Sequence, residues 1–165
     1  MRVEEKIAAL LKGSGCTLSA AESCTGGRIS HLITTVSGSS AYYLGSVTSY
    51  AVSVKEGVLG VSPVTIREKG VVSSEVAAAM AEGVRRLTGS TFSLATTGLA
   101  EGGDDKYPEG TVWIAAAGPL GTRTLLYRSK GGRKENIRNF TRRALYFLLD
   151  YIKNSQRAEK QVLKQ

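Results

Sequence analysis

The sequence is poor in cysteine, histidine and long apolar runs, and each shortage excludes a class of protein. Its 165 residues contain two cysteines, Cys16 and Cys24, one histidine, His31, and no CxxC pair. A zinc site with two histidine ligands is therefore excluded, no other metal-ligand spacing compensates, and we expect neither a metal nor a cofactor. No stretch approaches the roughly 18 apolar residues of a transmembrane helix, so we expect no membrane association.

What is present is typical of a small globular enzyme or binding domain. Hydrophobic residues make up 42% and charged residues 22% of the chain, and its length suits one hydrophobic core. The acidic N-terminal residues do not resemble a signal peptide, and two isolated cysteines suit a reducing compartment, so we predict a cytoplasmic protein. We predict a single domain over residues 1–154 and a polar, frayed tail over residues 155–165.

Positive charge is concentrated in the C-terminal part of the chain. Residues 1–122 contain ten Lys and Arg against eleven Asp and Glu, whereas residues 123–165 contain twelve against three. Such a basic segment attracts nucleic acid, an acidic membrane or a phosphorylated small molecule, or it is simply a solvated helix face. Because the chain has no helix-turn-helix signal, no aromatic pairs for base stacking and no zinc spacing, we do not expect nucleic acid as a partner.

Hydrophobic periodicity predicts helices that alternate with strands. Helical spacing of apolar residues predicts helices over residues 3–12, 28–35, 75–87 and 134–153, and a short helix or turn at 54–59. Alternating or buried apolar runs predict strands over 17–21, 44–51, 91–96, 111–117 and 123–128. The last two strands are joined by Gly118-Pro119-Leu120-Gly121, which indicates a hairpin. This order predicts an α/β fold, a three-layer α/β/α sandwich around a mixed, mostly parallel sheet with an antiparallel edge strand.

Three predicted strands end in small, polar, hydroxyl-bearing residues, at the edge where open α/β sheets bind ligands. These segments are 22–27, 49–50 and 96–98. The first reads Ser-x-Thr-Gly-Gly between a strand and a helix, an arrangement that directs backbone N–H groups at an anion or oxyanion. The same glycines also suit a tight strand-to-helix turn that binds nothing.

Ser23 in the first of these segments is a candidate nucleophile, and a nucleophilic serine needs a base. His31 lies inside a predicted helix, is poorly placed for a Ser-His-Asp triad and is more often a surface or packing residue. Lys55 follows Tyr50 by five residues, just past a strand end. Because partial burial lowers the pKa of a lysine, Lys55 is the other candidate base.

Six segments of the chain resemble one known family and occur in the family's order. They are AESCTGG (21–27), SGSSAYY (37–43), VTSY…VK…LGVS (47–62), GVVSSEVAAAMAEG (70–83), TTGLA (96–100) and EGTVWIA (109–115). Together they resemble the CinA C-terminal, or nicotinamide mononucleotide amidohydrolase, family over nearly the whole chain, in its stand-alone form. The resemblance implies hydrolysis of the carboxamide of nicotinamide mononucleotide to nicotinate mononucleotide and ammonia, in pyridine nucleotide recycling. It also implies a serine–lysine mechanism without a metal, and we expect a homo-oligomer.

The resemblance further implies roles for individual residues. Ser23 is the expected nucleophile and Lys55 the general base, with Ser40 as second-choice nucleophile or ligand of the reacting carbonyl. Backbone amides near Gly26 and Gly27 are expected to bind the oxyanion. The expected substrate-binding residues are Thr25, Gly26, Gly27, Tyr50, Thr97 and Gly98, with Arg133 or Arg138 holding the phosphate.

Two segments differ from the family's pattern. The loop of residues 98–110 is shorter than usual and lacks the first proline, and Glu101 adds a negative charge to it. The family's asparagine two residues after the tyrosine is replaced by Val52. The alternative hypothesis is therefore a catalytically inactive nucleotide-binding or regulatory module of the same fold.

Overall fold

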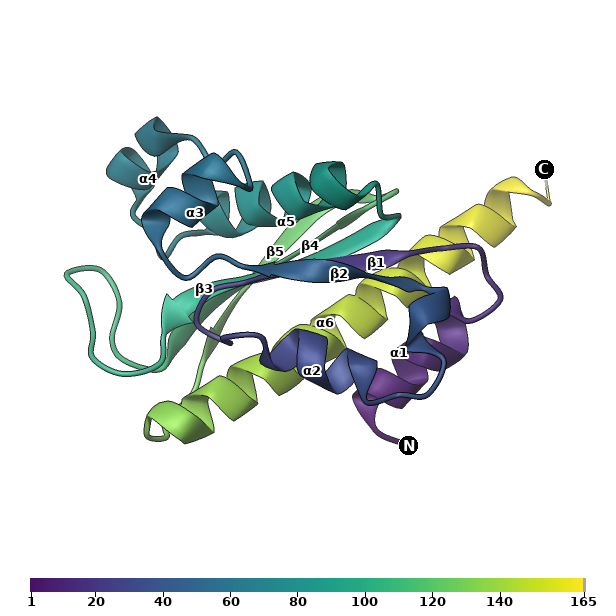
Figure 1. Ribbon diagram of the computed structural model, residues 1–165, viewed down its shortest axis with the longest axis horizontal. Helices are drawn as coiled ribbons and strands as arrows, with labels where there is room; N and C mark the ends of the chain where they lie inside the picture. Colours follow the sequence, from purple (N-terminus) through teal and green to yellow (C-terminus); the bar gives the residue numbers. More distant parts are fainter. Residues whose placement is uncertain (165) are drawn as a thin grey trace.

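The protein is a three-layer sandwich in which helices cover both faces of one sheet (Figure 1). The computed structural model describes residues 1–164. Its strands are β1 (Leu18–Glu22), β2 (Tyr43–Thr48), β3 (Phe92–Leu99), β4 (Thr111–Gly118) and β5 (Gly121–Arg128). One face carries α1 (Val3–Leu11), α2 (Arg28–Thr34) and α6 (Arg133–Val162), and the other carries α3 (Val52–Gly57), α4 (Pro63–Lys69) and α5 (Ser74–Thr88). The predicted fold class is confirmed.

The sheet is mixed, with the strand order β2-β1-β3-β4-β5. β1 pairs in parallel with β2 and with β3, whereas β4 is antiparallel to both β3 and β5. The reversed strand is therefore β4, which lies one position inside the sheet and not at its edge. The tight turn between Gly118 and Gly121 places β5 at the edge of the sheet, where it pairs antiparallel with β4, so the predicted hairpin and its antiparallel edge strand are confirmed.

Side-chain size differs between the two faces of the sheet. The larger side chains of Leu94, Val112 and Ile114 pack with the helices α1, α2 and α6, whereas alanines of the same strands pack with α5. Gly83 brings α5 close to the segment after α3, since a Cβ atom there would lie 2.1 Å from the carbonyl oxygen of Leu59. Small residues therefore let one helix approach the sheet closely.

Two helices differ from the sequence prediction. α4 was not predicted, although Ser62 caps it by accepting a hydrogen bond from the Thr65 amide and Pro63 occupies the first helical position. α6 extends to Val162, so the predicted boundary at residue 154 falls inside a helix, and residues 155–162 of the predicted frayed tail are helical. Good helix formers such as Gln, Arg, Ala, Glu and Lys follow residue 154, and Gln156 donates a hydrogen bond to the Leu10 carbonyl. No helix within residues 1–164 combines the length and apolar character needed to cross a bilayer.

Candidate active site

The parallel pairing of β1, β2 and β3 brings their carboxyl ends together at one edge of the sheet. Glu22, the last residue of β1, is in register with Thr48 of β2 and Thr96 of β3. Backbone hydrogen bonds continue this pairing one residue further, because the Ser23 amide donates to the Thr96 carbonyl and the Ser49 amide to the Glu22 carbonyl. Ser23 therefore leaves β1 at the edge where α/β proteins bind ligands.

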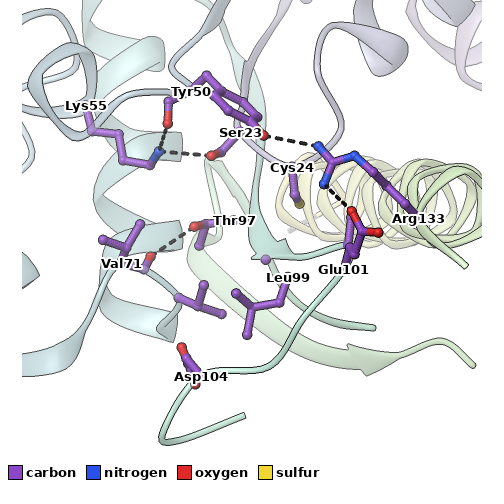
Figure 2. A pocket seen from close by; sticks show the side chains of 13 residues that line it. Ser23, Cys24, Tyr50, Lys55, Val71, Thr97, Leu99, Glu101, Asp104 and Arg133 are labelled. Atoms are coloured by element: carbon purple, nitrogen blue, oxygen red, sulfur yellow. Dashed lines mark hydrogen bonds and ion pairs between the residues drawn. The ribbon is translucent and has the colours of Figure 1, made fainter. Parts of the chain in front are cut away.

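A cavity of about 420 Å³ opens at this edge, a volume within the range of small-molecule sites (Figure 2). It is bounded by the ends of β1 and β3, by α3 and the residue Tyr50 before it, by the segment between α4 and α5, by the loop after β3, and by the first turn of α6. Its lining residues are Ser23, Cys24, Tyr50, Lys55, Val71, Val72, Thr97, Gly98, Leu99, Ala100, Glu101, Asp104 and Arg133.

The amine of Lys55 and the hydroxyl of Ser23 are in direct contact inside this cavity. Lys55 Nζ lies 2.9 Å from Ser23 Oγ, and the two side chains point toward one another (Figure 2). Lys55 has no exposed surface, and its Nζ also donates to the carbonyl oxygens of Ser49 at 2.6 Å and Tyr50 at 3.2 Å. Lys55 Nζ thus has three hydrogen-bond acceptors, Ser23 Oγ and the two carbonyls; in the neutral amine, with two N–H groups and one lone pair, the same geometry leaves the lone pair to the serine hydroxyl when both carbonyls accept an N–H.

Burial also sets the protonation of the two groups beside Ser23. Loss of hydration lowers the pKa of Lys55, which favours the neutral amine, against a smaller opposing effect of Cys24. Burial raises the pKa of the Cys24 thiol to about 12, so the thiol is protonated at neutral pH. Because the thiolate is the reactive form of cysteine, Cys24 is a poor nucleophile although it lines the same cavity.

Three exposed side chains from separate segments meet at the mouth of the cavity. Arg133 Nη2, at the start of α6, donates to Tyr50 Oη at 3.1 Å, and Arg133 Nη1 lies 3.7 Å from a carboxylate oxygen of Glu101 (Figure 2). The side chains of Arg133 and Glu101 are 46% and 67% exposed, so this ion pair is weak and a ligand can displace it. The predicted phosphate-binding Arg133 and Tyr50 therefore both lie at the cavity.

Thr97 and Gly98 line the cavity from β3, and both have structural roles. The Thr97 hydroxyl donates to the Val71 carbonyl at 2.9 Å. Its hydrogen atom is therefore already used, and the hydroxyl can only accept a hydrogen bond from a ligand. A Cβ atom on Gly98 would lie 2.5 Å from the carbonyl oxygen of Thr111, so the glycine is required by the close approach of β4. The packing of β3 against β4 is therefore sufficient to explain the glycine at this position, without a ligand.

Thr25, Gly26 and Gly27 are next to Ser23 in sequence, but they do not line the cavity. The Thr25 hydroxyl donates to the Glu22 carboxylate and is hydrogen-bonded to Thr96. Gly26 and Gly27 have positive φ angles of 59° and 93°, so the strand-to-helix turn itself requires glycine. The Gly26 amide donates to the Ser23 carbonyl at 3.1 Å, so of the two glycine amides expected near an oxyanion this one already has an acceptor.

Ser40 and Arg138 lie away from the cavity. Ser40 is exposed in η1 (Ser39–Ala41), which precedes β2 and therefore lies at the amino end of the parallel strands, opposite Ser23. Arg138 follows Arg133 on α6 by five residues, which turns its side chain about 140° around the helix axis. It lines a different pocket, between α6 and α2. Within one chain, the structure brings neither residue to Lys55.

Comparison with known proteins assigns the chain to one family. A family model described as "CinA C-terminal domain" matches residues 1–152. The chain belongs to the CinA C-terminal domain family. CinA-like proteins of Geotalea daltonii and Geobacter sulfurreducens are 47% identical over 135 residues and 45% identical over 141 residues. These matches cover 81% and 84% of this chain but 33% and 34% of the relatives, so the chain spans about a third of the length of these curated relatives.

Solved structures of CinA proteins superpose closely on this CinA domain. A competence-damaged protein (CinA) superfamily protein from Klebsiella pneumoniae gives a TM-score of 0.88 at 28% identity, covering 93% of this chain and 99% of that chain. The competence/damage inducible protein CihA from Agrobacterium tumefaciens gives 0.81 at 32% identity, covering 90% and 94%. These names state no chemical reaction.

Several cavity residues of this CinA domain were missed by the sequence analysis. Asp104 Oδ1 accepts hydrogen bonds from the amides of Lys106 and Tyr107, an Asx turn whose signal was present in the sequence. Val71 contributes its backbone carbonyl to Thr97, a role that a side-chain pattern cannot reveal. Within residues 1–164, no cluster of three or more His, Cys, Asp or Glu is placed to hold a metal ion.

Proposed function

We propose that this CinA domain hydrolyses the carboxamide of nicotinamide mononucleotide to nicotinate mononucleotide and ammonia, with Ser23 as nucleophile and Lys55 as general base. The observation that carries the proposal is the 2.9 Å contact between the buried Lys55 amine and the Ser23 hydroxyl. A serine beside a base in a ligand-sized cavity is the arrangement that acyl transfer requires. Lys55 fits the base because burial lowers its pKa, which increases the neutral fraction near physiological pH.

The reaction begins when the Lys55 lone pair takes the proton of the Ser23 hydroxyl. Ser23 Oγ then forms a bond to the amide carbon, and the carbonyl π electrons move to oxygen to give a tetrahedral oxyanion. As the oxyanion collapses, the C–N bond breaks and the Lys55 ammonium gives its proton to the leaving nitrogen, which departs as ammonia. Water, deprotonated by Lys55, hydrolyses the Ser23 ester and releases nicotinate mononucleotide.

We assign the oxyanion donor to the backbone amide of Cys24. It directly follows the nucleophile, the position that supplies one oxyanion donor in serine hydrolases built on a strand-to-helix turn. Among the hydrogen bonds of residues 1–164, the amides of Cys24, Thr25 and Gly27 have no oxygen acceptor, whereas the Gly26 amide is bonded to the Ser23 carbonyl; of the three, Cys24 is the one that lines the cavity. A lost oxyanion donor typically lowers turnover by about 10²–10³.

The two ends of the cavity suit the two ends of the substrate. Ser23 and Lys55 face the carboxamide, and Arg133 at the mouth offers a guanidinium to the phosphate. Tyr50 holds Arg133 from the opposite wall through the 3.1 Å hydrogen bond. The cytoplasmic location and the homo-oligomer remain predictions of the sequence, and sedimentation of the purified chain tests the oligomer.

Ammonia release from nicotinamide mononucleotide tests the proposal with a matched pair of serines. Ser23→Ala should lower turnover by about a thousandfold or more, because the nucleophile is removed. Ser40→Ala removes the same hydroxyl from the opposite end of the sheet and should leave turnover unchanged. Lys55→Met should be as inactive as Ser23→Ala. Full activity in a correctly folded Ser23→Ala protein would refute the assignment.

A non-catalytic nucleotide-binding module is the second candidate, and one observation favours it. Glu101 already occupies Arg133, at 3.7 Å, so the phosphate has to displace an internal partner. Calorimetric binding of nicotinamide mononucleotide without ammonia release from the wild-type chain would support this module and exclude the enzyme.

A further inference from the structure

A second pocket, of about 400 Å³, is lined by residues of α1, α2 and α6 and by Arg2. These three helices cover the same face of the sheet (Figure 1). Its charged side chains are those of Arg2, Glu4, Arg28, Arg138 and Arg142. Arg138 and Arg142 are four residues apart on α6 and therefore share one face of that helix. Arg28 begins α2, so guanidinium groups approach the pocket from two helices and from the N-terminus.

Three of these four arginines have no internal partner. Arg2 is paired with Glu4 at 3.3 Å and Glu5 at 3.0 Å. Within residues 1–164, the side chains of Arg28, Arg138 and Arg142 form no hydrogen bond and no ion pair. Arg28 Nε is moreover buried without an acceptor, which is unfavourable unless a bound molecule accepts its proton.

The remaining walls of the pocket are mostly apolar and aromatic, so they suit the organic part of a small molecule that carries negative charge. Apolar side chains of α2 and α6, Leu32 and Leu145, line the pocket together with the ring of Tyr146. The Arg142 guanidinium lies 5.8 Å from the centre of that ring, a cation–π contact that positions the guanidinium at the pocket wall. The volume is within the range of small-molecule sites.

We propose that this pocket binds a small molecule that carries a diphosphate group. Guanidinium groups match phosphate oxygens with two parallel hydrogen bonds each, so the buried Arg28 Nε and the exposed guanidiniums of Arg138 and Arg142 around one pocket suit an acceptor with several negative oxygens. Glu4 is the one acidic side chain in the lining, and Arg2 neutralises it. The site also accounts for part of the basic C-terminal segment, from which the first cavity uses only Arg133. It does not depend on the reaction proposed for Ser23.

Inorganic pyrophosphate is the probe that tests this site. Isothermal titration calorimetry at near-physiological salt should detect one strong site on the wild-type chain. Arg138→Gln together with Arg142→Gln should weaken binding by about tenfold or more, since two charge-assisted contacts are lost. The matched control is Lys153→Gln with Lys160→Gln, which removes two exposed charges from the same helix outside the pocket and should leave binding unchanged. Ammonia release from nicotinamide mononucleotide should be unchanged in both proteins.

Three outcomes would overturn the proposal. Absence of pyrophosphate binding to the folded wild-type chain, or equal weakening in the pocket and control variants, leaves no specific site. Loss of binding in Arg133→Gln but not in the α6 pair would assign the pyrophosphate to the first cavity. Salt-sensitive binding of duplex DNA through Arg138 and Arg142, without pyrophosphate binding, would assign the arginines to nucleic acid. Should the paired variant be unfolded by circular dichroism, Arg142→Gln alone gives the same readout.

Discussion

Lys55 Nζ and Ser23 Oγ lie 2.9 Å apart although their residues are separated by 32 positions in the sequence. Ser23 follows β1 and Lys55 lies in the short helix that follows β2, so the parallel pairing of these two strands creates the contact. Because the amine has no exposed surface, its protonation depends on the folded structure. Changes in pH therefore test this contact directly.

We predict that kcat/KM for nicotinamide mononucleotide rises with pH, because only the neutral form of Lys55 can take the serine proton. Burial lowers the pKa of Lys55, so the midpoint of this rise should lie below 10.5, the ordinary value for lysine. Initial rates across the pH range, with buffers of constant ionic strength, give the midpoint. A midpoint at or above that of an ordinary lysine would show that the amine is not buried in the active form.

The same lowered pKa predicts how the free energy of unfolding depends on pH. Below the pKa of the folded state, Lys55 is protonated in both states and the folded protein bears the cost of a buried charge. Between this pKa and 10.5 the unfolded chain binds more protons than the folded chain, so stability contributed by this group rises with pH. Urea unfolding should show a smaller rise in Lys55→Met than in the wild-type protein, with the two curves diverging only in this window.

The contact between Arg133 and Glu101 predicts that substitutions of these two residues change substrate affinity in opposite directions. Arg133→Gln should raise KM for nicotinamide mononucleotide by about tenfold or more with little change in kcat, because it removes the phosphate partner and not the chemistry. Glu101→Gln should lower KM by about two- to fivefold, since a surface ion pair is weak and its loss frees Arg133. The matched control is Asp105→Asn, an exposed acid of the same loop that does not line the cavity. Equal effects of Glu101→Gln and Asp105→Asn on KM would show that the loss of negative charge in the loop, and not the contact with Arg133, changes the affinity.

Cys24 is predicted to be dispensable for the chemistry despite its place beside Ser23. Its thiol, with a pKa of about 12, is protonated at neutral pH, so Cys24→Ala should keep turnover within about threefold of wild type. Iodoacetamide at neutral pH should modify the half-buried Cys16 faster than the buried Cys24. Peptide mass spectrometry measures both sites, and rapid alkylation of Cys24 with loss of activity would contradict this.

The sequence predicted which segments form the site better than which side chains point into it. Ser23, Lys55, Tyr50 and Thr97 lie at the cavity because strand ends can be located from hydrophobic periodicity, and Arg133, which the family resemblance indicated, lies there too. The direction of a side chain depends on the turn that follows the strand. The positive φ angles of the two glycines after Thr25 direct this turn away from the cavity, and periodicity does not reveal such angles.

A second kind of error arose because residues that are close in the sequence lie far apart in the structure. Arg133 and Arg138 were equivalent by sequence, but the rotation of five residues on α6 separates them onto two pockets. Ser40 shares a motif with residues near β2, yet it precedes that strand and therefore lies at its other end.

Glu22 is predicted to stabilise the turn that carries Ser23 rather than to act in catalysis. Its carboxylate is fully buried and accepts hydrogen bonds from the amides of Ile29 and Ser30 and from the Thr25 hydroxyl, at 2.8, 3.0 and 2.8 Å. Glu22→Ala leaves these donors without an acceptor and should lower the free energy of unfolding by about 3–5 kcal/mol. Glu68→Ala, at an exposed position on α4, should change it by less than about 0.5 kcal/mol. Urea denaturation followed by circular dichroism compares the two. If Glu22→Ala were as stable as Glu68→Ala yet inactive, the carboxylate would have to act on the substrate, and the assignment of Lys55 as the base would need to be reconsidered.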